Sequence, residues 1–305
     1  MHSYDVFVVA DLCIDLLFTG KVRPRYGQAE QFLEDYTIDL GGSAAIFAAQ
    51  FVKLGGNVGL LGKVGDDFFG HFLIEKLEKL GISSTHISLD SNRKTAVGVG
   101  LSDGADRAML TYAGTLHSIE SQDIQKDFAT ATKHWHIASY FLLENLWDHW
   151  VPFLQQLRQQ GGTVSLDTNW APKENWDRVH TLLPFVDVFL PNEEEAKLIS
   201  GKADVLEAGS WLASYCKIVV IKRGGAGAMV FDQGQIRQFD LPKTWTNKLL
   251  IADTTGAGDN FDAGFLRSWL IGKPIEDCVQ LGMKCGTLSL SAIGGIAAQL
   301  KEIIR

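Results

Sequence analysis

The second half of the chain alternates short apolar segments with segments of helical periodicity, and this alternation constrains the fold more than any other feature of the sequence. Apolar segments typical of buried strands span residues 134–139, 163–166, 186–190 and 218–221, and helical segments span 147–159 and 203–215. Strands connected through helices run parallel and bury both of their faces. The sequence therefore predicts an α/β fold with a doubly wound, mostly parallel sheet sandwiched between helices.

Polar residues follow three of these predicted strands directly. They are Asp167-Thr168-Asn169, the segment from Asn192 to Glu195 and the segment from Lys222 to Gly227. The carboxyl ends of parallel strands share one edge of a sheet, and open α/β sheets bind their ligands at that edge. We therefore expect these three segments to form one ligand site.

The N-terminal half supplies another strand and a helix that begins at two glycines. Residues 4–10 form an apolar run that leads to Asp11 and Asp15, which are expected beyond the end of that strand. Asp15 is a candidate contact for a hydroxyl-rich ligand, and a solvated turn residue is the alternative. Gly41 and Gly42 precede a strongly apolar helix, where they either admit a ligand to the backbone or only form the turn into the helix.

A hairpin interrupts the alternation of strands and helices. Residues 95–101 and 108–112 have strand-like patterns and are joined by a polar turn. Residues 16–40 contain only weak strand signals, broken by Gly and Pro. We expect these segments to form a small accessory sheet, which as a lid would exclude water from a transfer reaction.

Residues 250–265 combine a predicted strand, a tight turn and a helix. At the helix start, the backbone N–H groups of Gly256, Ala257 and Gly258 lack helical partners and lie at the positive end of the macrodipole. The glycines let a phosphate approach, and Asp259 places a carboxylate at the same point. N-capping alone would account for Asp259 but not for the surrounding glycines and threonines. The segment therefore favours phosphoryl transfer with a built-in base.

Charge and composition argue against several other classes of function. The chain of 305 residues has a formal net charge of −8 and no dense run of Lys or Arg, so a nucleic acid is not an expected partner. No membrane-length apolar segment or targeting pattern is evident, and we expect a cytoplasmic protein acting on a small molecule. The four cysteines lack metal or disulfide spacing. His134 and His136 would point the same way from a strand, but without an evident third ligand a zinc site is not expected.

Residues 253–261, Asp-Thr-Thr-Gly-Ala-Gly-Asp-Asn-Phe, resemble the C-terminal signature of the ribokinase-like (PfkB) carbohydrate kinase family. Three further motifs agree in order and spacing: the double glycine Gly41-Gly42, an N-x-x-E motif from Asn192 to Glu195, and a nucleotide loop from Lys222 to Gly227. The resemblance covers essentially the full chain. It implies a single ribokinase-like kinase domain over residues 1–305, with lid strands from about 12–40 and 94–113.

The resemblance also implies transfer of the γ-phosphoryl group of ATP to a hydroxyl of a sugar or sugar-like substrate. Asp259 would be the general base, and the backbone of Gly256, Ala257 and Gly258 would be the anion hole. The resemblance also implies ligands for the cofactors. Asn192 and Glu195 would bind Mg²⁺ through water. The residues that would contact the nucleotide are Asn192, Lys222, Gly224 and Gly227, and those that would hold a monovalent cation such as K⁺ are Asp253 and Thr255, with the loop around Gly294.

On the acceptor side, the resemblance implicates Asp15, Gly41, Gly42, Asp167 and Asn169. The chain departs from the family here. Ile46 replaces a frequent Asn, and Ala171 replaces an Arg that is frequent in sugar-acid kinases. A sugar carboxylate would lose a bidentate partner, which favours a neutral sugar or a nucleoside, although Arg107 on the hairpin is another source of positive charge. Lid strands of this family can pair between subunits, so a homodimer is possible.

Other functions remain as alternatives. A catalytically idle sugar- or nucleotide-binding regulator could share the fold, but it would have no chemical need for Asp259. A nucleoside kinase of the same family is a second alternative. A dinucleotide oxidoreductase lacks the expected G-x-G-x-x-G after the first strand. Asp262 lies inside the predicted helix and is assigned no catalytic role.

Overall fold

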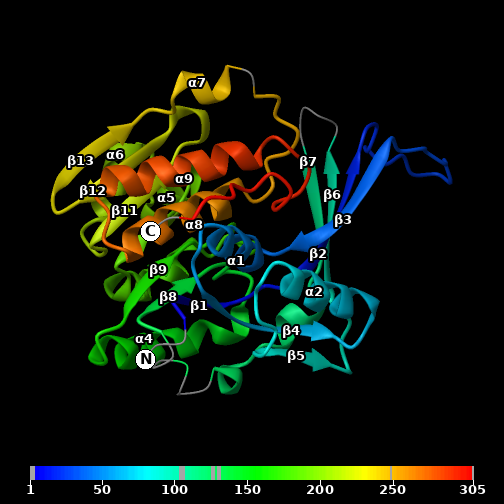
Figure 1. Ribbon diagram of the computed structural model, residues 1–305, viewed down its shortest axis with the longest axis horizontal. Helices are drawn as coiled ribbons and strands as arrows, with labels where there is room; N and C mark the ends of the chain where they lie inside the picture. The colour runs from blue at the N-terminus through cyan, green and yellow to red at the C-terminus, as the bar shows by residue number, and fades with distance from the viewer. Residues whose placement is uncertain (1–3, 103–106, 125–127, 129–131, 248, 304–305) are drawn as a thin grey trace.

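The computed structural model describes residues 4–102, 107–124, 128, 132–247 and 249–303. Among these residues, nine strands form one large sheet (Figure 1), in the order β13 (Gln235–Phe239), β12 (Ala228–Asp232), β11 (Ile218–Lys222), β10 (Val188–Phe189), β9 (Thr163–Leu166), β8 (His134–Ile137), β1 (Val6–Val9), β4 (Val58–Gly65) and β5 (Ile87–Asp90). Neighbouring strands are parallel, except that β12 runs antiparallel to both β11 and β13. The predicted mostly parallel sheet is confirmed.

Helices cover both faces of the large sheet (Figure 1). One face packs against α4 (Trp147–Gln159), α5 (Glu193–Ser200) and α6 (Val205–Leu212), and the other against α1 (Ser43–Lys53), α2 (Phe68–Lys79), α8 (Ala257–Leu270) and α9 (Ile275–Ser289). Successive side chains of β1 alternate between the two cores: Phe7 and Val9 join the first, and Val6 and Val8 the second. No helix in the described part of the chain has both the length and the apolar content needed to cross a membrane.

A second, smaller sheet lies beside the large one, at the right of Figure 1. It contains β3 (Asp35–Gly41), β2 (Cys13–Thr19), β6 (Ala96–Ser102) and β7 (Arg107–Tyr112) in that order. The expected accessory sheet is therefore present, although the turn at 103–106 lies outside the described residues. Pairing of this sheet between subunits stays a prediction.

The position of Asp15 differs from the expectation. The first strand ends at Val9, and Asp15 lies in the middle of β2, opposite Asp39 of β3 and Gly98 of β6. It is 5% exposed, so it is not a solvated turn residue. Sequence reasoning did not separate β1 from β2, because the two strands follow each other closely and have similar apolar patterns.

The strand expected before Gly256 is absent. Leu250 and Ile251 are 86% and 65% exposed, in a loop. The backbone N–H of Ala252 bonds the carbonyl of Leu290 at the end of α9 rather than a neighbouring strand. An apolar run alone was a misleading signal here, because a strand also needs a partner at an open sheet edge. A short helix, α7 (Lys243–Thr246), precedes this loop.

Candidate active site

A cavity of about 730 Å³ lies at the carboxyl edge of the large sheet, bordered by the small sheet and by the start of α8. The predicted site residues that line it are Asp15, Gly42, Asp167, Asn169, Asn192, Glu195, Lys222, Gly224, Gly227, Thr255, Gly256, Ala257, Gly258 and Asp259. Two predicted residues are not among these lining residues, but each contacts one that is: Gly41 packs against Asp15, and Asp253 bonds Thr255. The fold thus gathers segments that are far apart in the chain around one space.

The turn before α8 requires a glycine at its N-cap. Gly256 has a left-handed backbone with φ 71°. A Cβ atom at Gly256 would lie 2.9 Å from the side chain of Ile46 and 3.0 Å from the Cα of Gly295. The conformation and the space therefore both favour glycine. The residues that follow begin α8, where backbone N–H groups lack helical acceptors and can bind an anion.

Two side chains fasten this turn to the loop around Gly294. One carboxylate oxygen of Asp253 accepts bonds from the N–H and the hydroxyl of Thr255, at 3.0 and 2.8 Å, and the other accepts from the N–H of Gly294 at 2.9 Å. The amide of Asn260 donates to the carbonyls of Gly256 and Gly295, at 2.8 and 2.9 Å. The N-terminal turn of α8 is therefore held against the loop of Gly294 and Gly295.

Asp259 is the third residue of α8 and is only 8% exposed. Burial raises the pKa of its carboxyl group to about 7, and the negative charges of Asp167 and Asp11 act in the same direction. Lys222 and a hydrogen bond from Ser43 oppose this rise. A carboxyl group with a pKa near neutrality is well suited to accept a proton in a reaction.

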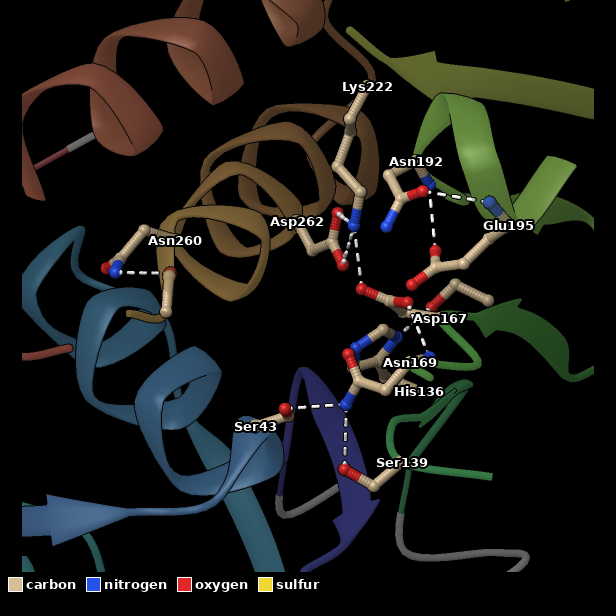
Figure 2. Close-up of polar contacts among 12 residues, drawn as sticks. Ser43, His136, Ser139, Asp167, Asn169, Asn192, Glu195, Lys222, Asn260 and Asp262 are labelled. Atoms are coloured by element: carbon tan, nitrogen blue, oxygen red, sulfur yellow. Dashed lines mark hydrogen bonds and ion pairs between the residues drawn. The ribbon is translucent and has the colours of Figure 1, made fainter. Parts of the chain in front are cut away.

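Lys222 points inward from the end of β11 and contacts two buried carboxylates (Figure 2). Its Nζ lies 2.7 Å from Asp167 and 3.1 Å from Asp262. The sequence predicts Lys222 at the border of the nucleotide and assigns Asp262 no catalytic role, so sequence reasoning missed this contact. No local signal could have revealed it, because Lys222 and Asp262 lie 40 positions apart in the chain.

Asn192 and Glu195 form a reciprocal cap at the start of α5 (Figure 2). The Asn192 side chain accepts a bond from the Glu195 N–H at 2.9 Å, and the Glu195 carboxylate accepts one from the Asn192 N–H at 2.8 Å. Burial, followed by the charge of Asp167, raises the pKa of Glu195 to about 7. The N-x-x-E pattern is therefore a helix cap as well as a pair of oxygen donors on the cavity wall.

Glycines make room for the two N-terminal aspartates. A Cβ atom at Gly41 would lie 2.2 Å from the Asp15 carboxylate, and one at Gly98 would lie 3.1 Å from it. Gly42, with φ 91°, is the N-cap of α1, and a Cβ there would lie 2.1 Å from the carbonyl oxygen of Asp11. The double glycine therefore allows close packing against the Asp15 carboxylate and the Asp11 backbone carbonyl.

A hydrogen-bonded chain joins the D-x-N element to the start of α1 (Figure 2). The Asn169 amide donates to the hydroxyls of Ser43 and Ser139, at 2.6 and 2.9 Å. The Ser139 hydroxyl donates to Asp11 at 2.6 Å, and Asp11 accepts the N–H groups of Ser43 and Ala44. Sequence reasoning assigned neither serine to the site, because a single hydroxyl at a helix start or in a loop carries little signal.

The predicted nucleotide loop is a tight turn between β11 and β12. Gly224 and Gly227 have φ of 52° and 84°. A Cβ at Gly227 would lie 1.9 Å from the carbonyl oxygen of Phe239, whereas no described atom lies within 4 Å of a Cβ at Gly224. Gly227 is thus required for packing, and Gly224 leaves the cavity side of the loop open.

His134 and His136 are packing residues of the sheet. His134 bonds the hydroxyls of Thr163 and Ser165, and His136 bonds Ser165, each at 2.8 Å. Burial lowers the pKa of both imidazoles to about 3. Both side chains are thus neutral and satisfied by protein groups.

The fold and the cavity define an α/β protein in which a glycine turn and a helix start lie beside a buried carboxylate, an arrangement that suits a phosphotransferase. The chain belongs to the pfkB family of carbohydrate kinases, since the model described as "pfkB family carbohydrate kinase" matches residues 5–302.

Individual relatives agree with this assignment. The chain is similar to a cytidine kinase of Thermococcus kodakarensis, 32% identical over 80% of this chain and 85% of the relative. It is also similar to a fructokinase of Klebsiella pneumoniae, 27% identical over 96% and 95% of the two chains. A solved structure of a ribokinase II from E. coli, described as putative and in complex with ATP and Mg²⁺, shares the fold with a TM-score of 0.83, 21% identity and coverage of 97% and 96%.

Proposed function

We propose that this chain is an ATP-dependent kinase that transfers the γ-phosphoryl group to a hydroxyl of an uncharged sugar or nucleoside. The observation that carries this proposal is the start of α8, where Asp259 and the Gly256 turn share one wall of the cavity. The four-stranded sheet, which contributes Asp15 and Gly98 to the cavity lining, acts as the lid of a single kinase domain.

In the proposed reaction, Asp259 accepts the proton of the acceptor hydroxyl as its oxygen attacks the γ-phosphorus. The bond between the γ-phosphorus and the bridging oxygen of ADP breaks, and ADP leaves with that electron pair. The N–H groups of Ala257 and Gly258 donate to the oxygens of the transferring group, where negative charge accumulates. Asp15 and Asn169 orient the acceptor from the other side.

The oxygen donors at Asn192 and Glu195 fit Mg²⁺, which prefers oxygen ligands and retains waters. Burial and the charge of Asp167 raise the pKa of Glu195 and so disfavour its ionised form. A divalent cation bound beside Glu195 would stabilise that negative charge. Bound Mg²⁺ would neutralise phosphate charge. For K⁺, Asp253 and Thr255 remain the proposed site, although the Asp253 carboxylate already ties Thr255 to Gly294.

The cavity walls favour an uncharged acceptor. Among the described lining residues Lys222 is the sole cation, and it is paired with Asp167, whereas Asp11, Asp15 and Asp259 add negative charge. A sugar acid or sugar phosphate would therefore meet repulsion without a compensating partner. Arg107 at the start of β7 has a side chain outside the described part of the structure, so its role stays a prediction.

A nucleoside acceptor is supported by a separate observation. Met109, Leu116 and Leu142 are among the residues that line the cavity, and apolar side chains suit contact with the face of a base. The relative named cytidine kinase is 32% identical to this chain.

An ADP-release assay over neutral sugars, nucleosides, sugar acids and sugar phosphates, with and without K⁺, tests the proposal. We expect turnover with a neutral sugar or a nucleoside. Turnover confined to an anionic acceptor would contradict the charge argument. No turnover with any acceptor would favour the alternative of an idle sugar- or nucleotide-binding regulator.

We expect kcat/KM to rise with pH around a midpoint near 7, because Asp259 accepts a proton only when ionised and its pKa is about 7. Activity should be lost as the pH falls through this value. The measurement is kcat/KM for the acceptor over a pH series. Glu195→Gln is the control, since Glu195 has a similar pKa, and its profile should keep the same midpoint. A midpoint near the ordinary aspartate pKa would contradict the assignment of the base.

Glu195→Gln should raise the Mg²⁺ concentration for half-maximal velocity about tenfold. Glutamine retains an oxygen that can accept the Asn192 N–H, so the helix cap persists while the charge is lost. Glu194→Gln is the matched control, because its side chain is 72% exposed on the same turn. Identical Mg²⁺ titrations for both variants would argue against the metal role of Glu195.

A further inference from the structure

The ammonium group of Lys222 lies directly beneath the predicted anion hole. A Cβ atom built on Gly258 would be 3.3 Å from Lys222 Nζ and 3.8 Å from its Cε. The backbone of Gly258 is therefore within a few ångströms of a full positive charge. Any larger residue at position 258 would press on this ammonium group.

Buried carboxylates hold the ammonium group at this point (Figure 2). Nζ donates to Asp167 at 2.7 Å and to both oxygens of Asp262 at 3.1 and 3.2 Å. The Lys222, Asp167 and Asp262 side chains are 12%, 4% and 1% exposed. An ammonium group that donates to two carboxylates is stabilised in its charged form. Lys222 is therefore charged.

The backbone of Lys222 connects the same residue to a second motif. Its N–H bonds the carbonyl of Pro191 at 2.9 Å, and it forms an isolated bridge with Asn192. One residue thus touches the N-x-x-E segment through its backbone, and the D-x-N element and α8 through its side chain.

Stability is a poor explanation for this arrangement. Removing two carboxylates and an ammonium group from water costs more than burying apolar side chains of similar size. Asp262 is not among the described residues that line the cavity, so it has no direct contact to offer a ligand there. Its bidentate contact does fix the position of Nζ relative to the turn.

We propose that Lys222 is a positioning residue, anchored by Asp262, whose buried charge increases the capacity of the Gly258 turn to bind the negative charge of the transferring phosphoryl group. This inference rests on the proposed kinase function. Because the charge to be stabilised grows during transfer, Lys222 should act on kcat more than on the KM of either substrate.

The test compares Lys222→Met with the double variant Lys222→Met/Asp262→Asn. Lys222→Met leaves two buried carboxylates without a cation and should lower Tm as well as kcat. The double variant removes one positive and one negative charge, so the formal net charge of the cluster equals that of the wild type. We expect the double variant to have a higher Tm than Lys222→Met, because one buried carboxylate instead of two lacks a cation. Its kcat should stay at least tenfold below the wild type, with the KM of ATP and of the acceptor within threefold.

Recovery of both Tm and kcat in the double variant would overturn the inference, because Lys222 would then only neutralise its neighbours. An increase in KM with an unchanged kcat would also overturn it. If Lys222→Met does not fold, the double variant decides alone, since it leaves one buried carboxylate without a cation where the single variant leaves two. Absence of wild-type turnover would contradict the proposed kinase and this inference together, whereas full turnover of the double variant contradicts this inference alone.

Discussion

Replacing Asp259 with asparagine is expected to lower kcat by about 10³-fold, within the range for loss of a general base. Asparagine has nearly the same shape but cannot accept the proton of the acceptor hydroxyl. The affinities for ATP and for the acceptor should change little, because the turn from Gly256 to Gly258 remains. Single-turnover kinetics and calorimetric titration of both substrates measure the two effects separately.

Thermal stability supplies the control for Asp259→Asn. Burial raises the pKa of Asp259 in the folded protein from 3.8 to about 7. The folded state therefore binds the proton more tightly than the unfolded state, and the ionised carboxylate reduces stability as the pH rises through this range. Above neutrality the asparagine variant should have a Tm equal to or above that of the wild type. A kcat close to that of the wild type would reject Asp259 as the base.

Replacing Gly42 with alanine is expected to lower the free energy of unfolding by about 3 kcal/mol and to abolish most activity. Gly42 combines φ 91° with a Cβ position 2.1 Å from the Asp11 carbonyl oxygen, which is backbone and cannot rotate away. Relief of this clash would shift the start of α1, where Asp11 and Asn169 meet Ser43. Urea denaturation and the ADP-release assay measure the two losses.

Gly81→Ala is the matched control for Gly42→Ala. Gly81 follows a helix with a similar φ of 82°, but its nearest contact is Val52 Cγ1 at 3.7 Å. Gly81→Ala should lower the free energy of unfolding by about 1 kcal/mol, which is the cost of placing alanine in a left-handed backbone without a clash. Equal losses for the two variants would show that backbone conformation, and not the contact with Asp11, determines the effect.

Several site features could be predicted because their signals are local. The helix start at Ala257, with a left-handed glycine before it, follows from the neighbouring residues. The cap between Asn192 and Glu195 is likewise a three-residue interaction. The alternation of strands and helices then places the ends of β9 and β11 at one edge, since parallel strands share their direction.

Other features had no local signal. The contact of Lys222 with Asp262 joins residues 40 positions apart, and the bond between Asn169 and Ser43 joins residues 126 positions apart. Asp15 was expected at the end of the first strand and instead lies within β2 of the second sheet. The sequence pattern marks apolar segments but not the sheet to which each one pairs.

The sequence by itself determined the family, the alternation of strands and helices between residues 134 and 221, and the glycine turn that precedes Asp259, because backbone conformation and apolar periodicity depend on neighbouring residues. Only the tertiary structure decided which charges meet. It directed Lys222 inward to Asp167 and Asp262 and placed its ammonium group beneath Gly258. The physical reason is that the pairing of buried charges depends on the order of strands in the sheet and on the helix packed above it, which bring distant residues within hydrogen-bonding distance.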